Sequence, residues 1–197
     1  MGDQARIDAL LTNLRSNDYQ LRKAAAQALG QLRAPEAVAP LMTLIADSPP
    51  WLRDSAVDAI VALGPVAVEA LIGGLQSAKR EVRQSCTEGL GRIRDSRAVP
   101  ALLDCLKDRN CEIVPEIAAA LGEIGDRGTV PTLISLLQAG ASPGEVGGGF
   151  VREAAAKALG NIGDPTAVDP LRRALRDRET YVQDAAGEAL AKIPWKR

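Results

Sequence analysis

Hydrophobic residues recur along this chain in two interleaved series. The first series is led by Ile7, Val38, Val68, Val99, Val130 and Val168. In the second, an arginine usually follows the apolar leader: Leu21-Arg22, Leu52-Arg53, Val82-Arg83, Ile113-Val114, Val151-Arg152 and Val182-Gln183. Steps within each series are 30 or 31 residues, apart from one step of 38. Two series with a common period predict a structural repeat of about 31 residues.

Each repeat reads as two helices. After both kinds of lead residue, apolar side chains follow at spacings of three and four, as in residues 99–106 and 151–162, which is the period of a half-buried helix. Gly125-Asp126 and Gly163-Asp164 fit a helix end followed by a capping residue. The alanine-rich second helices suit close packing between neighbouring repeats, because one repeat alone cannot bury its apolar stripe.

We therefore expect an all-α fold, a right-handed α-solenoid (superhelix) of six two-helix repeats with about twelve helices. Residues 1–197 would form a single array. The 38-residue step predicts a glycine-containing loop insertion near residues 140–149. The expected repeats span approximately residues 5–33, 35–64, 65–95, 96–126, 127–164 and 165–194.

The amino-acid composition excludes several kinds of catalytic and metal site. The chain has no histidine, so it cannot build a His-based triad or a His metal site, and we expect no catalytic residue and no metal. We see no apolar run of about 18 residues and no signal peptide, so we expect no membrane span. Three cysteines without framework spacing agree with a reducing compartment, and we expect a cytoplasmic protein.

The outward positions of the second helices are predominantly acidic. Because phosphate backbones require basic surfaces, and the formal net charge is −1, we do not expect nucleic acid as a partner. An ordinary solvated helix face is the alternative reading of these charges. The acidic residues are Asp54, Asp58, Glu88, Glu116, Glu123, Glu153, Asp184 and Glu188, against the basic residues Lys23, Arg92, Lys157 and Lys192.

Four of the five aromatic residues occupy one place in the repeat, one or two residues before a second-series leader. They are Tyr19, Trp51, Phe150 and Tyr181. One interpretation is a row of anchors for a partner or a planar chromophore. The other is a hydrophobic staple, in which each ring packs on the first turn of its own helix.

The arginines of the second series have a structural interpretation and a functional one. Their guanidinium groups would bond loop carbonyls or carboxylates, including those of Asp95, Asp126 or Asp164. Alternatively they would bind the propionate groups of a ligand. Arg152 follows three glycines near a helix N-terminus, where backbone N–H groups attract anions. A connecting loop without ligand contacts is the alternative at this place.

Two strings carry a family resemblance. VREAAAKALGNIGDPTAVDPL (151–171) and AVPALLDCL (98–106) resemble the phycobilisome-lyase type of HEAT-like repeat. GEVGGGFVREAAAKALG (144–160) is similar to a longer loop in one subunit of the E/F-type phycobilin lyases. The resemblance implies handling of an open-chain tetrapyrrole and its attachment to a phycobiliprotein cysteine by a pair of different subunits. Here the similar loop lies in the fifth of six repeats.

The functional expectation is a protein-binding HEAT-repeat scaffold, non-catalytic on its own. The resemblance implies a phycobilin lyase subunit or a phycobiliprotein-binding assembly factor. Its partner would be a phycobiliprotein or a second HEAT-repeat subunit, and phycocyanobilin would be a transferred ligand rather than a resident cofactor. The alternative is a general interaction scaffold unrelated to phycobilisomes. The candidate binding residues are Trp51, Phe150, Arg152, Tyr181, Glu88, Glu116 and Glu153.

Overall fold

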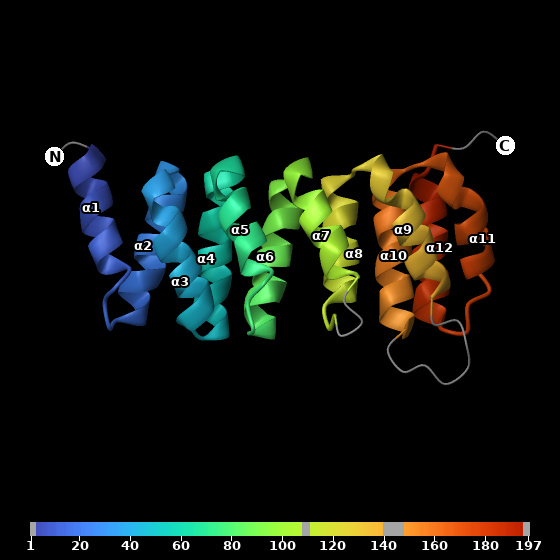
Figure 1. Cartoon of the computed structure of the whole chain (residues 1–197), viewed down its shortest axis with the longest axis horizontal. Coiled ribbons are helices and arrows are strands. Elements are labelled where there is room, and N and C mark those ends of the chain that lie inside the picture. The colour runs from blue at the N-terminus through green and yellow to red at the C-terminus, as the bar shows by residue number, and fades with distance from the viewer. Residues whose placement is uncertain (1–2, 108–110, 140–147, 195–197) are drawn as a thin grey trace. The chain divides into compact units, whose positions relative to one another are not determined.

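The computed structural model describes residues 3–107, 111–139 and 148–194. These residues form twelve α-helices and five short 3-10 helices, and no strand occurs among them (Figure 1). The all-α fold class predicted from the sequence is therefore confirmed. The chain divides into two compact units, Met1–Ala98 and Val99–Arg197.

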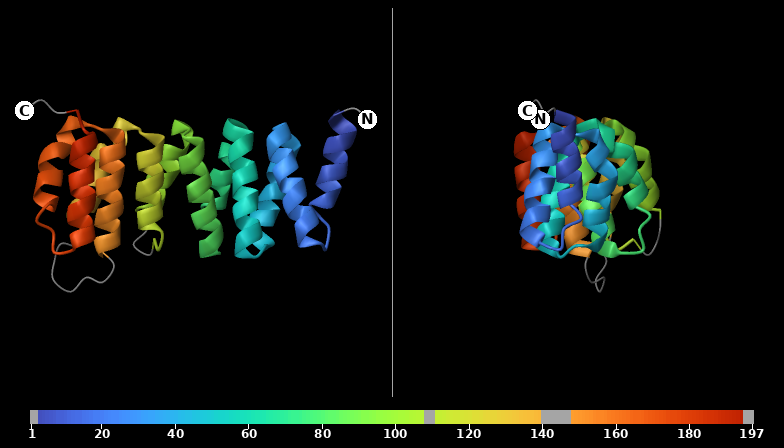
Figure 2. Two further views of the ribbon diagram at one scale, coloured as in Figure 1. Left: turned by 180° about the vertical axis from the view of Figure 1, so that it is seen from behind. Right: turned by 90° about the vertical axis from the view of Figure 1, so that its left-hand side faces the viewer.

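Unit 1 contains six α-helices in two layers. The second helices of successive repeats pack side by side, α2 on α4 and α4 on α6, while α3 and α5 pack against each other and on their own second helices. Figure 2 shows the helices from two further sides. The helices are α1 (Asp3–Asn13), α2 (Tyr19–Leu32), η1 (Pro35–Ala37), α3 (Val38–Asp47), α4 (Pro50–Leu63), η2 (Gly64–Ala67), α5 (Val68–Gly74), α6 (Arg80–Ile93) and η3 (Ser96–Ala98).

Unit 2 repeats the same arrangement. Helix α10 is central, because it packs against α8, α12 and α9, and α11 packs against α12 and α9. The helices are α7 (Val99–Cys105), α8 (Val114–Ile124), η4 (Arg127–Thr129), α9 (Val130–Gln138), α10 (Gly148–Ile162), η5 (Pro165–Ala167), α11 (Val168–Ala174) and α12 (Thr180–Lys192).

The lead valines of the first series mark helix starts. Each of the five opens a first helix, from α3 to α11, directly after a single turn of 3-10 helix. Capping explains two of these turns. The Asp126 carboxylate accepts the Gly128 N–H at 2.7 Å, and the Asp164 carboxylate accepts the Thr166 N–H at 2.9 Å. Gly125 and Gly163 precede them with φ of 78° and 71°, so the predicted glycine end and aspartate cap are confirmed.

Neighbouring second helices approach closely at glycine. A Cβ added to Gly122 would lie 2.5 Å from the Ala158 Cα, and one added to Gly160 would lie 2.6 Å from the Ala189 Cα. Gly30 makes the same approach to Ala59 at 2.9 Å. The glycine occupies one fixed position of the second helix and the alanine another. These two small residues therefore allow the same close approach between neighbouring second helices in different repeats.

The core lies between the two layers of each unit. Leu102, Leu133 and Leu171 of the first helices and Ala155 and Leu159 of α10 are fully buried. Burial of the apolar stripe that the sequence repeats is the main favourable term holding such a stack together.

Pro50–Gly74 is long and apolar enough, by length and composition, to cross a membrane. The expectation that no such stretch exists is therefore wrong for this segment. The stretch comprises α4, η2 and α5, and Leu52, Ile60 and Leu71 within it are fully buried. Core packing between repeats accounts for its apolar character.

The structure bears in part on the predicted organisation of the chain. The six repeat boundaries and the single array stay predictions. The predicted loop insertion falls mostly on residues 140–147, which lie outside the described residues. Gly148 and Gly149, which were expected in that loop, are instead the first residues of α10.

Candidate functional site

The aromatic residues form two pairs, one in each unit. The Tyr19 and Trp51 rings lie with centroids 5.6 Å apart at 75°, edge to face, between the starts of α2 and α4. The Phe150 and Tyr181 rings stack at 5.5 Å and 18° between α10 and α12. This arrangement is neither a continuous row of four rings nor four separate hydrophobic staples, because each ring contacts a ring of a neighbouring second helix.

These pairs expose large apolar surfaces. Phe150 is 61% exposed, and Trp51 is 44% exposed. Gly149 adjoins the second pair, where an added Cβ would collide with the Tyr181 hydroxyl. Exposed aromatic clusters of this kind are typical anchors of protein interfaces.

Arg152, the candidate anion-binding residue, is buried and paired. Its side chain is 1% exposed, and its Nε and Nη2 donate to the two Asp177 carboxylate oxygens at 2.7 and 2.9 Å. The hydrogen bond from Arg152 holds the pKa of the Asp177 carboxyl below its ordinary value, and the same bond raises the pKa of Arg152. Arg152 therefore fastens the loop after α11 to α10, and its role toward a ligand stays a prediction.

Loop carbonyls are the partners of other arginines in the series. Arg53 donates to the Ile45 and Ser48 carbonyls at 3.2 Å. Arg83 donates to the Ser77 and Ala78 carbonyls at 2.9 and 3.1 Å. The structural interpretation of these two arginines is confirmed.

Gln183 explains one break in the arginine series. It occupies the arginine position of the last repeat, and its Nε2 donates to the Asp177 carbonyl oxygen at 2.6 Å. A neutral amide thus makes the same kind of contact to a preceding loop. Arg22 differs from both: its guanidinium lies 4.4 Å from the Tyr19 ring centroid, a cation–π contact.

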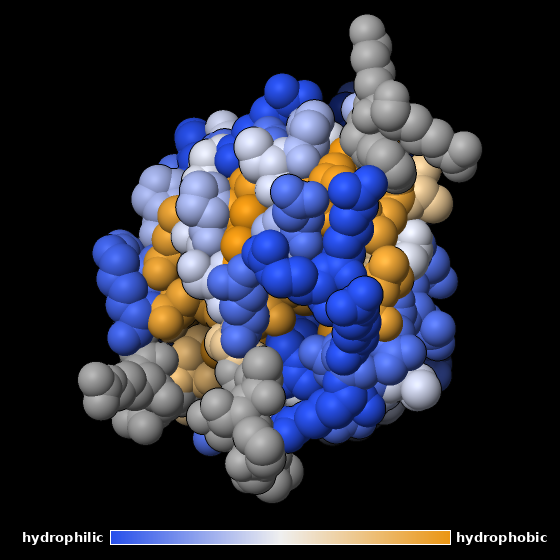
Figure 3. Space-filling view, turned by 90° about the vertical axis from the view of Figure 1, so that its right-hand side faces the viewer, coloured by the Kyte–Doolittle hydropathy of each residue, from blue (hydrophilic) through white to orange (hydrophobic). Residues whose placement is uncertain are grey.

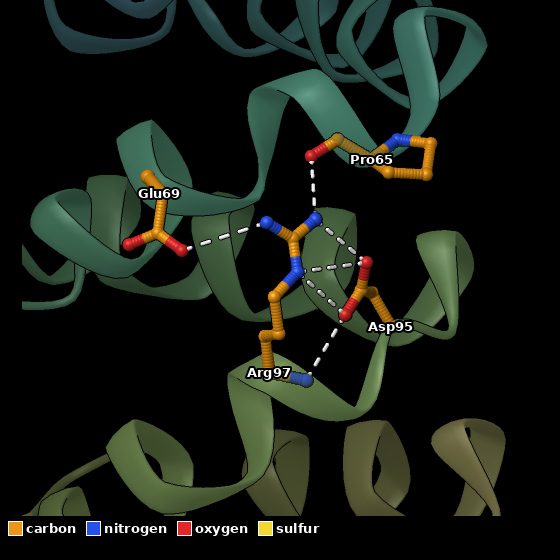
Figure 4. Close-up of polar contacts among 4 residues, drawn as sticks. All are labelled: Pro65, Glu69, Asp95 and Arg97. Atoms are coloured by element: carbon orange, nitrogen blue, oxygen red, sulfur yellow. Dashed lines mark hydrogen bonds and ion pairs between the residues drawn. The ribbon is translucent and has the colours of Figure 1, made fainter.

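The predicted pairing of the second-series arginines with Asp95, Asp126 or Asp164 is wrong, because these carboxylates bind other groups. Asp126 and Asp164 cap 3-10 turns. Asp95 is bound by Arg97, whose Nη2 also donates to the Pro65 carbonyl at 2.8 Å and whose Nη1 lies 3.7 Å from the Glu69 carboxylate (Figure 4). Arg97 thereby ties two successive repeats of unit 1 together.

The second helices of unit 2 carry an excess of acidic groups on their outward positions. Five carboxylates face two lysines there; Lys157 pairs with Glu153 at 2.6 Å, and Lys192 donates to the Asn161 amide oxygen at 3.1 Å. In unit 1, Arg92 binds both Asp58 at 2.8 Å and Glu88 at 3.1 Å. Such exposed pairs add at most about 1 kcal/mol each, and negative charge remains in excess on these positions of unit 2. The five carboxylates belong to Glu116, Glu123, Glu153, Asp184 and Glu188.

Two cavities, which the sequence reasoning missed, lie at one repeat position in the two units. One, of about 560 Å³, lies beside α3 and includes Arg22, Pro40, Thr43, Asp47 and Ser48. The other, of about 430 Å³, lies beside α11 and includes Arg152, Pro170, Arg173, Asp177 and Arg178. Counted from the lead residue of each helix, these two sets correspond one to one. A sequence signal exists for the second cavity: four arginines fall within residues 172–178.

Comparison with a family profile decides what the repeat is. The profile described as HEAT repeats matches residues 7–83, 68–145 and 149–194. The chain belongs to the HEAT-repeat family. Comparison with curated protein sequences gives no match.

Among solved structures, this HEAT-repeat chain is similar to a lyase complex. The complex of CpcE and CpcF of phycocyanin lyase from Nostoc sp. PCC7120 is 26% identical, with a TM-score of 0.59, over 91% of this chain and 74% of that chain. The resemblance to E/F-type lyases is thus confirmed as a resemblance. An engineered protein (24% identity, TM-score 0.53, 98% and 96% coverage) and a designed armadillo repeat protein (19%, 0.54, 95% and 99%) share the fold.

The candidate binding residues of the HEAT repeats divide between the units. Trp51 and Glu88 lie in unit 1, and Glu116, Phe150, Arg152, Glu153 and Tyr181 lie in unit 2. The structure brings Phe150 and Tyr181 into contact. Within the described residues, no group of three or more cysteine and carboxylate side chains is placed to hold a metal ion.

Proposed function

We propose that this HEAT-repeat protein is a phycobiliprotein-binding scaffold, acting as a phycobilin lyase subunit or as an assembly factor. The observation that carries the proposal is the 26% identity to the CpcE–CpcF phycocyanin lyase complex over 91% of the chain. Because that relative is a complex of two proteins, the chain would act with a second HEAT-repeat subunit and would not catalyse the reaction alone. The cytoplasm is its expected location.

The binding surface would centre on the exposed aromatic pair of unit 2. Phe150 stacks on Tyr181 while remaining 61% exposed. A partner side chain or a planar chromophore can therefore cover the Phe150 ring with little loss of side-chain conformational entropy. The acidic residues Glu116 and Glu153 of the neighbouring second helices would select a basic partner surface. Trp51, with Tyr19, would provide a second contact in unit 1.

The test mixes the purified protein with apo-phycobiliprotein, with and without phycocyanobilin. We expect a complex in size-exclusion chromatography with light scattering, and a shift of the bilin absorbance. Phe150→Ala should weaken the complex about tenfold, as expected for an aromatic anchor. Val66→Ala is the matched control, since Val66 is also apolar and 54% exposed but lies in η2.

A general scaffold unrelated to phycobilisomes is the second candidate. The exposed Tyr19–Trp51 pair favours it, because such clusters serve interfaces with many kinds of protein. Absence of both a complex and an absorbance shift in the mixing experiment would sink the phycobiliprotein proposal and leave this one.

A further inference from the structure

The cavity beside α11, hereafter the arginine pocket, is built entirely within unit 2. Its apolar floor includes Leu137, Pro170 and Ala174, all of them buried. The guanidinium groups of Arg173, Arg176 and Arg178 border it and are exposed to solvent. The space-filling view of this end of the chain shows hydrophilic residues gathered beside apolar ones (Figure 3).

The charges around the arginine pocket do not cancel. Its lining carries four arginines and a single carboxylate, that of Asp177. Arg152 forms a bidentate ion pair with that carboxylate, so one negative charge stands against four positive charges in the lining. Arg178 lies 3.5 Å from Glu179, whereas Arg173 and Arg176 make no ion pair with another described residue. A positive field therefore faces the cavity.

The base of the pocket is rigid. Asp177 accepts the Glu179 N–H at 3.0 Å in addition to both Arg152 bonds, and its own carbonyl accepts Gln183. The short segment that carries Arg176 and Arg178 is thus fixed to α10 and α12. A backbone held in place before a ligand arrives reduces the entropy that is lost on binding.

We propose that the arginine pocket binds a small molecule carrying phosphate or multiple carboxylate groups. Guanidinium groups form paired, charge-assisted hydrogen bonds with both kinds of oxyanion. A volume of about 430 Å³ falls in the range of small-ligand sites. This site is independent of the proposed phycobiliprotein surface, so either proposal can fail alone.

The equivalent cavity in unit 1 shows which residues make the difference. Thr43 stands at the position of Arg173, and Ser48 at that of Arg178. Asp47, at the position of Asp177, binds Lys79 at 3.1 Å rather than Arg22. The same scaffold therefore exists with and without the arginine border, and the residues of one copy define substitutions that the other copy should tolerate.

Isothermal titration calorimetry with inorganic phosphate and, separately, citrate at low ionic strength tests the site. We expect one site per chain for at least one of the two probes. Arg173→Thr and Arg178→Ser should each weaken binding about tenfold, the effect of losing one charge-assisted hydrogen bond. Stronger binding of phosphate identifies a phosphate-bearing ligand, and stronger binding of citrate identifies a polycarboxylate.

Arg172→Ala is the matched control, because Arg172 is adjacent, pairs with Asp169 at 3.5 Å and does not line the pocket. The affinity of the Arg172→Ala variant for the probe should stay within about twofold of that of the unsubstituted protein, since a screened surface charge contributes little. Circular dichroism establishes that each variant is folded. The proposal is overturned if neither probe binds, or if Arg172→Ala weakens binding as much as the pocket variants do.

Discussion

At the scale of single residues, the same side-chain type serves different purposes in successive repeats. Arg53 and Arg83 bond loop carbonyls, Arg152 bonds a carboxylate, and Arg22 stacks on a tyrosine ring. The sequence places an arginine one residue after the lead apolar residue. It does not give the acceptor, because the acceptor belongs to a loop whose backbone course depends on the next helix. The sequence therefore does not predict Asp177 as the acceptor for Arg152.

Asp177→Asn should be strongly destabilising. The substitution leaves the 1% exposed Arg152 without its counter-charge, and loss of one partner of a buried pair costs about 3–5 kcal/mol. Urea unfolding at pH 7 measures this loss. Asp169→Asn is the control; it removes a carboxylate that is 79% exposed and should change stability by less than about 0.5 kcal/mol.

The pH dependence of the same pair has a defined sign. Arg152 lowers the pKa of Asp177 in the folded protein, so ionised Asp177 stabilises the fold above its unfolded pKa of about 3.9. That stabilisation is lost as pH falls through the folded pKa. The stability difference between the unsubstituted protein and Asp177→Asn should therefore narrow below about pH 4. A difference that stays constant from pH 7 to pH 3 would contradict the assignment.

At the scale of elements, helix starts were the most predictable feature. The first-series valines open α3, α5, α7, α9 and α11 because each follows a single 3-10 turn and begins an apolar stripe. The pairing of aromatic rings across helices was not predictable to the same extent. Sequence spacing puts Phe150 and Tyr181 at equivalent positions, but their contact depends on how closely α10 and α12 approach.

Gly122→Ala tests that approach. The new Cβ would lie 2.5 Å from the Ala158 Cα, and because backbone cannot move aside alone, α8 and α10 must separate. We expect a loss of about 1–3 kcal/mol in calorimetric unfolding despite the better helix propensity of alanine. Gly73→Ala is the control, since nothing lies within 4 Å of its added Cβ; it should be neutral or slightly stabilising. Equal effects of the two substitutions would disprove the close contact.

At the scale of the whole molecule, the repeat itself was predictable and the division into units was not. The hydrophobic period continues through residues 98 and 99 without a change, so nothing in the pattern marks a boundary there. The two cavities were also missed, because each combines residues of more than one helix with residues of the connecting loops. The four arginines within residues 172–178 are the sequence signal by which the second cavity could have been found.

Destabilisation should be local in a chain whose repeats contact mainly their neighbours. Leu102 is fully buried, so Leu102→Ala should cost about 2–5 kcal/mol through lost burial and a cavity. Hydrogen exchange measured by mass spectrometry should accelerate in α7 and α8, with α2 and α4 changing by less than about twofold. Uniform acceleration across both units would show that the chain unfolds as one cooperative body.

The correspondence of the two cavities has an evolutionary consequence. A repeat protein can grow by copying a segment of its own gene, and the cavities beside α3 and α11 share an aspartate at the same repeat position, Asp47 and Asp177. Side chains on the border of such a cavity, such as Thr43 in one copy and Arg173 in another, can then diverge while the fold is preserved. Duplication thus supplies a chain with spare pockets before any ligand selects among them.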